Sequence, residues 1–307
     1  MQIHYGTEHI KNLTNAVVTS GTFDGVHLGH QKILKRLTET AQSSGGEAVV
    51  LTFWPHPRMV VSNDSQDLKL LSTLDEKIEL LAQNGVNHLV VIPFTREFSE
   101  LSSEEFISQI LVEKIGTKKL IIGYDHRFGR NREGGFEYLK DNAHRYGFEI
   151  EEITKQEIDN LTISSTKIRQ SLVSGATHVA NELLGRPYSF TGLVAKGRQL
   201  GRTIGFPTAN VQVPESFKLI PANGVYAVKI SVRGQYHFGI MNIGNRPTVE
   251  GIGRTQEVFI FDFDADIYGE KLTAELLEFI RPEQKFEGLE VLKAQIYKDI
   301  DVAKSFL

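Results

Sequence analysis

The stretch that most restricts the fold of this chain is Gly21–His30, with the sequence GTFDGVHLGH. It follows an apolar run, Ala16–Ser20, that is typical of a buried strand, and it precedes apolar residues that recur at helical spacing as far as Ala41. The stretch is therefore predicted to be a strand-to-helix turn. Such a turn presents free backbone N–H groups and the positive end of a helix to an anion.

Glycines and histidines give this turn a more specific character. Gly21 and Gly25 allow unusual dihedrals and close backbone approach. His27 and His30 fall on one face of the first helical turn, and Gly29 leaves room between them for a bulky phosphate. A single histidine at a helix start is more often a cap or a surface group. Two histidines around a glycine, after two more glycines and an acid, favour a site for a nucleotide triphosphate.

Composition excludes several classes of protein. The 307 residues, 40% of them hydrophobic, are enough for two domains with cores of their own. The absence of cysteine excludes disulfides, thiolate zinc sites and cysteine nucleophiles. A net charge of −4 gives no indication of an extended basic surface for nucleic-acid binding. No apolar run approaches the ~20 residues of a membrane span, and Met1–Tyr5 lacks the basic segment followed by an apolar segment that is typical of a leader. We expect a soluble, cytoplasmic protein without membrane or nucleic-acid partners.

Charge and histidine content change near Gly185–Pro187. The chain before this point is acidic and holds nine of the ten histidines, whereas the remainder is close to neutral. This predicts two domains, residues 1–185 and residues 186–307.

Strand and helix patterns alternate through the first of these domains. The expected strands are Ala16–Ser20, Glu47–Phe53, His88–Pro93, Lys119–Ile122 and Phe148–Ile153, and the expected helices are Leu74–Asn84 after a Thr73 cap, Ser102 or Ser103 to Ile115, and Phe136–Tyr146. Alternation of this kind predicts an α/β fold, a doubly wound parallel sheet with right-handed crossovers. Ligands bind such sheets beyond the carboxyl ends of the strands, where the Gly21–His30 turn lies.

Three further stretches follow predicted strands. Phe53–Pro57 carries His56 and aromatic rings toward the carboxyl edge, although a rigid turn is an equal alternative. Gly123–Gly129 adjoins a basic loop suited to phosphates. Leu161–Arg169 offers four hydroxyls and two cations at a helix start, a second anion site. A capping serine would explain one of these hydroxyls but not the set.

The His-x-Gly-His spacing resembles the signature of the nucleotidyltransferase superfamily, and the full Gly21–His30 stretch is similar to that of the bacterial FAD synthetases. The resemblance implies that Asp24, His27 and His30 contact ATP, that Ser165, Thr166 and Arg169 hold the leaving pyrophosphate, and that Asp125 and Phe128 line the nucleotide or flavin pocket. The residues it marks as binding nucleotide or flavin are Gly21, Phe23, Asp24, Gly25, Gly29, Phe53, His56, Asp125, Phe128, Ser165 and Thr166, with His27, His30 and Arg169 catalytic. One departure is His126, where many relatives have phenylalanine.

Short alternating strands separated by glycines replace this pattern in the second domain. The expected strands are Ser189–Ala195, Gly224–Val232, Tyr236–Asn242, Gln256–Phe263 and Leu272–Ile280, followed by a helix over Phe286–Phe306. Strands of this length and spacing predict a small antiparallel β-barrel with a C-terminal helix.

The distinctive segment of this domain is Gly197–Asn210, with the sequence GRQLGRTIGFPTAN. Its glycines and arginines predict a mobile cationic loop, and Pro207 stiffens the exit so that Thr208 and Asn210 are presented together. A hydroxyl and an amide oxygen are hard ligands that suit Mg²⁺. The alternative interpretation is that this segment is an ordinary Gly/Pro-rich connection between strands, with no role in binding. No Gly-x₄-Gly-Lys-Ser/Thr loop is present, so the chain is not a P-loop enzyme.

The segment GFPTAN closely resembles the signature of the riboflavin kinases, supported by Gly224–Tyr226, Met241–Thr248 and Arg281–Phe286. The resemblance implies that Thr208 and Asn210 bind Mg-ATP and that Glu257 is the general base toward the ribityl 5′-hydroxyl. The other residues expected to bind nucleotide or flavin are Gly197, Arg198, Gly205, Asn242 and Arg281. By strand alternation Glu257 shares a face with Phe259 and Phe261, where an acid is costly unless it is used or paired in a salt bridge.

Taken together, the motifs are similar to those of the bifunctional riboflavin kinases/FMN adenylyltransferases, which implies synthesis of FMN and then FAD from riboflavin, with ATP as substrate in both steps and Mg²⁺ as cofactor. Two other interpretations stay open. One is a flavin- or nucleotide-binding regulator whose catalysis has decayed, and the other is an adenylyltransferase fused to a nucleic-acid-binding barrel. The near-neutral second domain, without a basic stripe among stacking aromatics, disfavours the latter. The sequence leaves the oligomeric state open.

Overall fold

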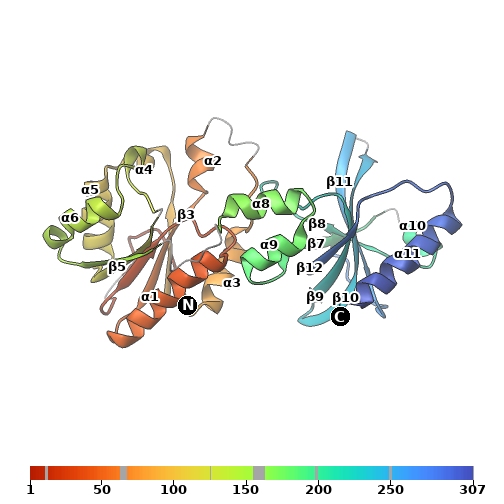
Figure 1. The fold of residues 1–307 in the computed structure, drawn as a ribbon, viewed down its shortest axis with the longest axis horizontal. Helices are drawn as coiled ribbons and strands as arrows, with labels where there is room; N and C mark the ends of the chain where they lie inside the picture. Colours follow the sequence, from red (N-terminus) through yellow and green to blue (C-terminus); the bar gives the residue numbers. More distant parts are fainter. Residues whose placement is uncertain are drawn as a thin grey trace. The chain divides into compact units, whose positions relative to one another are not determined.

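The structure is a computed structural model that describes residues 1–10, 13–62, 68–124, 126–154, 163–197, 200–248 and 251–306 (Figure 1). Its residues fall into two units, Met1–Ser164 and Ser165–Leu307. Each unit has apolar clusters of its own and is described by itself.

The first unit is built on a six-stranded sheet in the order β1-β4-β3-β2-β5-β6. Its strands are β1 (Gln2–Tyr5), β2 (Val17–Ser20), β3 (Ala48–Trp54), β4 (His88–Pro93), β5 (Lys119–Gly123) and β6 (Glu149–Ile153). All of these neighbours pair in parallel, which confirms the predicted sheet. The sequence did not predict β1, because this edge strand is largely exposed and lacks the apolar run of a buried strand.

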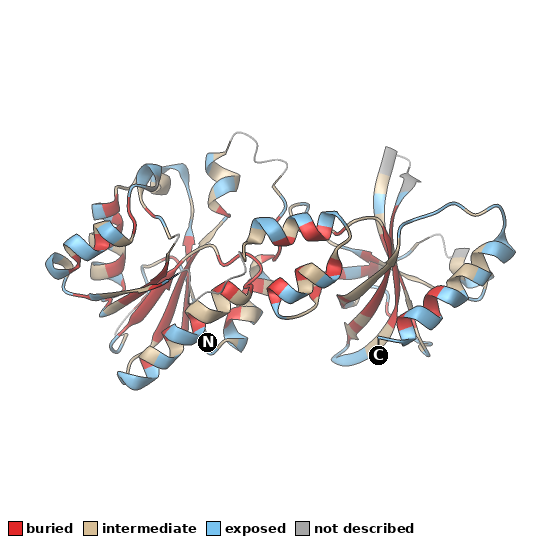
Figure 2. Cartoon of the chain, viewed as in Figure 1, coloured by how far each residue is buried: buried red, intermediate tan, exposed pale blue. Residues whose placement is uncertain are grey.

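Helices cover both faces of this sheet. They are α1 (Leu28–Ser43), α2 (Pro57–Val61), α3 (Leu74–Gln83), α4 (Arg96–Ser99), α5 (Ser103–Glu105), the π-helix η2 (Phe106–Lys114), the 3₁₀ helix η3 (Arg130–Arg132) and α6 (Phe136–Tyr146). Val17 packs in one cluster with Leu34 of α1, whereas its neighbour Val18 packs in the other with Leu139 of α6. Figure 2 shows the inner strands of the sheet buried and the outer helix faces exposed.

Two helices are capped by the residues at which the sequence predicts a helix start, Thr73 and Ser102. Thr73 caps α3, since its Oγ1 accepts from the Glu76 N–H at 3.2 Å while the Glu76 carboxylate accepts from the Thr73 N–H at 2.9 Å. Ser102 caps α5 in the same way with Glu105. The helix predicted to continue from there to Ile115 does so as the π-helix η2, a difference that apolar spacing does not reveal, because its buried side chains fit either period.

The second unit contains a closed antiparallel barrel in the order β10-β11-β8-β7-β12-β9, which confirms the fold predicted for this half. Its strands are β7 (Tyr188–Ala195), β8 (Ala209–Gln212), β9 (Gly224–Val232), β10 (Gln235–Thr248), β11 (Gly251–Ile260) and β12 (Lys271–Arg281). The short strand β8 was not predicted. The C-terminal helix α11 (Leu289–Lys304) buries Ile300 and Ala303 against the barrel.

Helices α8 (Ser165–Val173) and α9 (Thr177–Leu184) precede the barrel and belong to its unit, as does the short α10 (Leu200–Thr203). The amide of Asn181 on α9 donates to the carbonyls of Leu276 and Leu277 at 2.9 and 3.2 Å, and its oxygen accepts from the Tyr188 N–H at 2.7 Å. By packing, the second unit therefore begins at Ser165. The division into domains at residue 185 stays a prediction.

Candidate active sites

The turn between β2 and α1 places two histidines at the start of α1. His27 is the N-cap residue, and its Nδ1 accepts a hydrogen bond from the backbone N–H of His30 at 3.3 Å. The two imidazole rings stack with centroids 3.6 Å apart and ring planes 15° apart. The prediction that both rings share one face of the helix is confirmed. Because Nδ1 of His27 accepts, its neutral ring carries the proton on Nε2.

The backbone of this turn adopts rarely populated conformations. Phe23, Gly25 and Val26 have φ values of 47°, 80° and 40°. Glycine enters this left-handed region without penalty, whereas phenylalanine and valine pay about 1–2 kcal/mol each. Conformations of this kind persist only where the surrounding structure fixes them.

Asp24 supplies one of the contacts that fix the turn. Its carboxylate is 2% exposed and accepts hydrogen bonds from the Leu71 N–H at 2.9 Å and the Ser72 N–H at 3.1 Å. The Ser72 hydroxyl also accepts from the Gly25 N–H at 3.1 Å. Asp24 thus joins the turn to the segment that leads into α3, a structural role that the sequence did not predict. Its contact with ATP stays a prediction.

The expectation of free backbone N–H groups in this turn is wrong at several positions. The Gly21 N–H donates to the Leu51 carbonyl at 3.0 Å and the Val26 N–H to the Phe23 carbonyl at 3.2 Å. The Gly25 and His30 N–H groups have the partners given above. These four donors are used to shape the turn. The positive end of α1 and the imidazoles are further features of the turn that favour an anion.

Aromatic residues from several segments meet near the carboxyl ends of β3 and β5. Phe53 lies 6.5 Å from Phe106 and Phe106 lies 5.6 Å from Phe128, measured between ring centroids. His56 is buried and caps α2, its Nδ1 accepting from the Arg58 N–H at 3.1 Å, which is the contact expected of a rigid turn. The nucleotide-side roles of Phe53, His56 and Phe128 stay predictions.

His126, whose role the sequence left open, lies in the same region. Its Nε2 is 3.1 Å from the Ser20 hydroxyl at the end of β2, and its ring lies 5.8 Å from that of Phe128. The neighbouring Asp125 lies outside the described residues. Gly29 is buried within α1.

The residues predicted to hold pyrophosphate lie at the start of α8. Ser165 begins this helix, and Thr166 and Arg169 follow within its first turns. The helix start was predicted and is confirmed. Because α8 belongs to the second unit, the role of these side chains in a site with the histidines stays a prediction.

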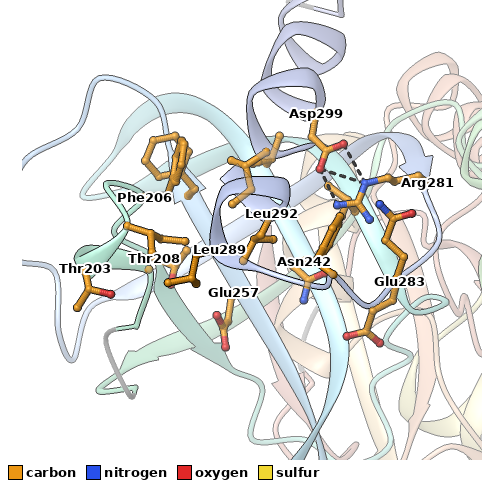
Figure 3. A pocket seen from close by; sticks show the side chains of 18 residues that line it. Thr203, Phe206, Thr208, Asn242, Glu257, Arg281, Glu283, Leu289, Leu292 and Asp299 are labelled. Carbon is orange, nitrogen blue, oxygen red and sulfur yellow. Dashed lines mark hydrogen bonds and ion pairs between the residues drawn. The ribbon is translucent and has the colours of Figure 1, made fainter. Parts of the chain in front are cut away.

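A cavity of about 420 Å³ lies in the barrel unit, bordered by α11 and by the segment around Phe206 (Figure 3). Thr208, Asn242, Glu257 and Arg281, all predicted site residues, line it. The apolar part of its wall consists of Ile204, Phe206, Val225, Ile240, Phe259, Phe286, Leu289, Leu292 and Ile296. An apolar cavity with a few convergent polar groups suits a small aromatic ligand.

Glu257 is the middle one of three polar residues that lie side by side on the neighbouring strands β10, β11 and β8. In the pairing of β11 with β10 it lies opposite Asn242, and in the pairing with β8 it lies opposite Asn210. Residues directly opposite on neighbouring strands share a face, with Cβ atoms roughly 5 Å apart. Glu257 is 9% exposed, and Phe259 lines the cavity beside it, as strand alternation predicts. The structure therefore brings a largely desolvated carboxylate between two amides.

The glycines before β8 let the chain pass close to this row. A Cβ atom at Gly197 would overlap the side-chain amide of Asn210, so a larger residue there would displace this amide. Gly205 has a φ of +90°, a conformation that other residues rarely adopt. Arg198 lies outside the described residues.

Arg281 has a partner that the sequence did not suggest. Its Nε donates to Asp299 at 2.9 Å and its terminal nitrogen donates to the same carboxylate at 2.7 Å, which makes a two-point contact between β12 and α11 (Figure 3). Gln295 also donates to Asp299 at 2.8 Å. Asp299 is 2% exposed. Asp299 belongs to no recognisable motif. The one sequence signal for it is an acidic residue on the apolar face of an amphipathic helix.

Within the described ranges, no group of three or more His, Asp or Glu residues is arranged to hold a metal ion. Among the helices placed by the structure, none is long and apolar enough to cross a membrane.

Comparison with known proteins covers both units. The FAD synthetase family profile matches residues 9–167, and the riboflavin kinase profile matches residues 184–307. A bifunctional riboflavin kinase/FMN adenylyltransferase of Listeria monocytogenes is 42% identical over 95% of this chain and 92% of its own length. The protein of that name from Escherichia coli is 40% identical over 97% and 96%.

A crystal structure titled as a macrolide-efflux protein from Streptococcus pneumoniae matches 100% of both chains with a TM-score of 0.91 and 30% identity. It shares the fold, and the efflux named in its title is a statement about that protein. The two profiles and the full-length relatives agree in naming both activities. The chain therefore belongs to the family of bifunctional riboflavin kinases/FMN adenylyltransferases.

Proposed function

We propose that this chain makes FAD from riboflavin in two ATP-dependent reactions. In the barrel unit riboflavin is phosphorylated to FMN, and in the α/β unit FMN receives an adenylyl group from ATP, with release of pyrophosphate. The observation that carries the proposal is the position of Glu257, a carboxylate 9% exposed, between Asn210 and Asn242 in the wall of an apolar cavity.

Glu257 acts as the general base of the kinase reaction. A primary alcohol is a poor nucleophile, so a carboxylate within hydrogen-bond reach assists its attack. The 5′-hydroxyl oxygen of riboflavin attacks the γ-phosphorus of ATP, its proton passes to Glu257, and ADP leaves. Asn242 and Arg281, which line the same cavity, orient the flavin, and the apolar wall limits the access of competing water.

Thr208 and Asn210 are the residues that would hold Mg²⁺ with ATP. Thr208 lines the same cavity as Glu257, and Asn210 lies opposite Glu257 in the pairing of β8 with β11. Mg²⁺ retains several waters and binds few protein oxygens together with substrate phosphates. The lack of an acidic cluster in the described residues fits an ion shared with the nucleotide. When bound, the ion would neutralise phosphate charge.

Adenylyl transfer requires that FMN and ATP are aligned and that the negative charge developing on the phosphates is stabilised. The phosphate of FMN is already anionic, so its oxygen attacks the α-phosphorus of ATP without a protein base, and pyrophosphate leaves. We assign stabilisation of the developing charge to His27 and His30 and retention of pyrophosphate to Ser165, Thr166 and Arg169. The stacked imidazoles at the start of α1 support the first assignment.

The proposal includes the cellular setting. The substrates are small molecules, and the net charge of −4 supports the absence of a nucleic-acid partner. We place the protein in the cytoplasm, where ATP for both reactions is available.

The test is a time course that separates riboflavin, FMN and FAD after the chain is mixed with riboflavin, ATP and Mg²⁺. We expect FMN to form first and FAD to follow. Supplied FMN should give FAD without riboflavin. A chain that binds flavin but forms neither product would be a regulator, and the proposal would be wrong.

A further inference from the structure

Helix α3 contains a buried lysine that none of the proposed steps uses. Lys77 is 2% exposed. Its Nζ donates to the Thr52 hydroxyl at 3.5 Å and lies 5.5 Å from the centroid of the Trp54 ring. Burial lowers the pKa of Lys77 to about 8, although the negative charge of Asp24 acts in the opposite direction. A buried ammonium group with few partners is costly to the fold, so its presence calls for a functional reason.

Lys77 is connected to the turn that carries the two histidines. The Thr52 hydroxyl accepts from Lys77 and donates to the carbonyl of Thr22 at 3.4 Å. On the other side of the turn, Asp24 accepts from the N–H groups of Leu71 and Ser72, which lead directly into α3. One helix therefore holds the strained turn from two directions, through a side chain and through the segment before its cap.

The charges in this region also bear on anion binding. Asp24 is a buried carboxylate within the same turn as His27 and His30. In a weakly polarisable interior its charge would oppose the approach of nucleotide phosphates. Lys77 is a positive group whose charge acts on this carboxylate. Its Nζ also lies against the Thr52 hydroxyl and the Trp54 ring of β3, which are uncharged.

We propose that Lys77 is a positioning residue for adenylyl transfer. It holds the turn through Thr52, and its positive charge offsets the negative charge of Asp24. The phosphates of ATP are then repelled less when they approach the histidines. This inference rests on the proposed adenylyl transfer in the α/β unit. Lys77 is buried and acts through its neighbours, without touching the substrate.

The first test uses the full chain with Lys77→Met, a change of similar length that removes the charge. We expect kcat/KM for ATP in the conversion of supplied FMN to FAD to fall at least about tenfold, the size of effect of a charged hydrogen bond. Phosphorylation of riboflavin should be unchanged. Lys77→Arg should restore most of the lost activity, and Lys35→Met, which removes a lysine whose side chain is 76% exposed on α1, should change neither reaction.

Thermal unfolding distinguishes positioning from a purely structural role. Trp54 is the single tryptophan of the chain, so its fluorescence follows the unfolding of the α/β unit. Lys77→Met removes a buried charge that makes one long hydrogen bond, at 3.5 Å, while Asp24 keeps its hydrogen bonds from the N–H groups of Leu71 and Ser72. We therefore expect the Trp54 transition at the same temperature or higher, despite the loss of activity.

The pH dependence gives a second readout. Adenylyl transfer by the unsubstituted chain should decline as the pH rises through about 8, where Lys77 loses its proton, while Lys77→Arg should remain active beyond that pH. The proposal is overturned if Lys77→Met makes FAD at the normal rate, if its loss of activity matches a loss of the folded α/β unit, or if Lys77→Arg shows the same decline. Failure of the unsubstituted chain to make FAD from FMN would instead refute the proposed function.

Discussion

The two candidate sites obtain their polar groups from different kinds of structure. In the barrel, Asn210, Glu257 and Asn242 come from three neighbouring strands and meet through strand register. In the α/β unit, His27 and His30 come from one turn and meet through helical spacing. The barrel site is a cavity of about 420 Å³ with a largely apolar wall, whereas the turn contains strained residues and is held by contacts from the segment that leads into α3.

This difference indicates how each site works. A desolvated carboxylate in an apolar cavity suits proton transfer from a weak nucleophile. Paired imidazoles at a helix start suit the stabilisation of phosphate charge when the nucleophile is already anionic. Substitutions in one unit should therefore affect one reaction and leave the other as an internal control.

The largest effect is expected for Glu257→Gln. The amide keeps the shape of the side chain but cannot accept the proton of the 5′-hydroxyl, so phosphorylation of riboflavin should fall at least about 100-fold. Conversion of supplied FMN to FAD should be unchanged. Both rates can be measured by separation of riboflavin, FMN and FAD. Normal kinase activity in this variant would remove Glu257 from the mechanism and break the contrast between the sites.

His30→Ala should have the converse effect. Removal of one preorganised charge donor should lower adenylyl transfer about 100-fold, while the kinase rate stays unchanged. The measurement is the rate of FAD formation from supplied FMN. His144, on α6 of the same unit, provides the control, since His144→Ala should not change this rate. Equal losses of both activities in His30→Ala would contradict a role confined to one site.

Sequence patterns predicted what is local in both sites. The spacing of His27 and His30 predicted their shared face, and strand alternation placed Glu257 beside Phe259 in the cavity wall. The order of strands and helices likewise predicted the parallel sheet and the barrel.

The contacts missed by sequence reasoning join segments that are far apart in the chain. Asp24 bonds to Leu71 and Ser72, and Arg281 to Asp299. Each depends on how a helix packs, which local spacing does not encode. Two of the backbone donors of the Gly21–His30 turn were expected to be free for the same reason, since the partner of the Gly21 N–H lies on β3 and that of the Gly25 N–H lies before α3.

A smaller effect is expected for Asp299→Asn. This change leaves the Arg281 guanidinium, in a side chain 17% exposed, without its charged partner, and the barrel unit should lose about 3 kcal/mol of unfolding free energy. Because Arg281 and α11 both border the cavity, we expect a rise in KM for riboflavin with adenylyl transfer unchanged.

Denaturation followed by circular dichroism, with Trp54 fluorescence as the marker of the other unit, measures this loss. The matched control is Glu270→Gln, which removes the partner of Arg233 at a pair with side chains 51% and 42% exposed. Exposed pairs contribute about 0.5 kcal/mol or less. Equal effects of the two substitutions would show that the Arg281 pair does not hold the cavity wall.

The smallest effect concerns acid, to which the two units should respond differently. His4 on β1 is 3.1 Å from His88, which is in turn 3.1 Å from Glu47. Burial, with a contribution from His88, lowers the pKa of His4 below its usual 6.5, so the unfolded chain binds more protons than the folded unit. The resulting stability is present above pH 6.5 and is lost as the pH falls below that value. Because His4 belongs to this unit, its Trp54 transition should shift to lower temperature between pH 7 and 5 more than the barrel transition does. His4→Gln should reduce the shift, and an unchanged shift would show that the acid sensitivity of the sheet lies elsewhere than at its β1 edge.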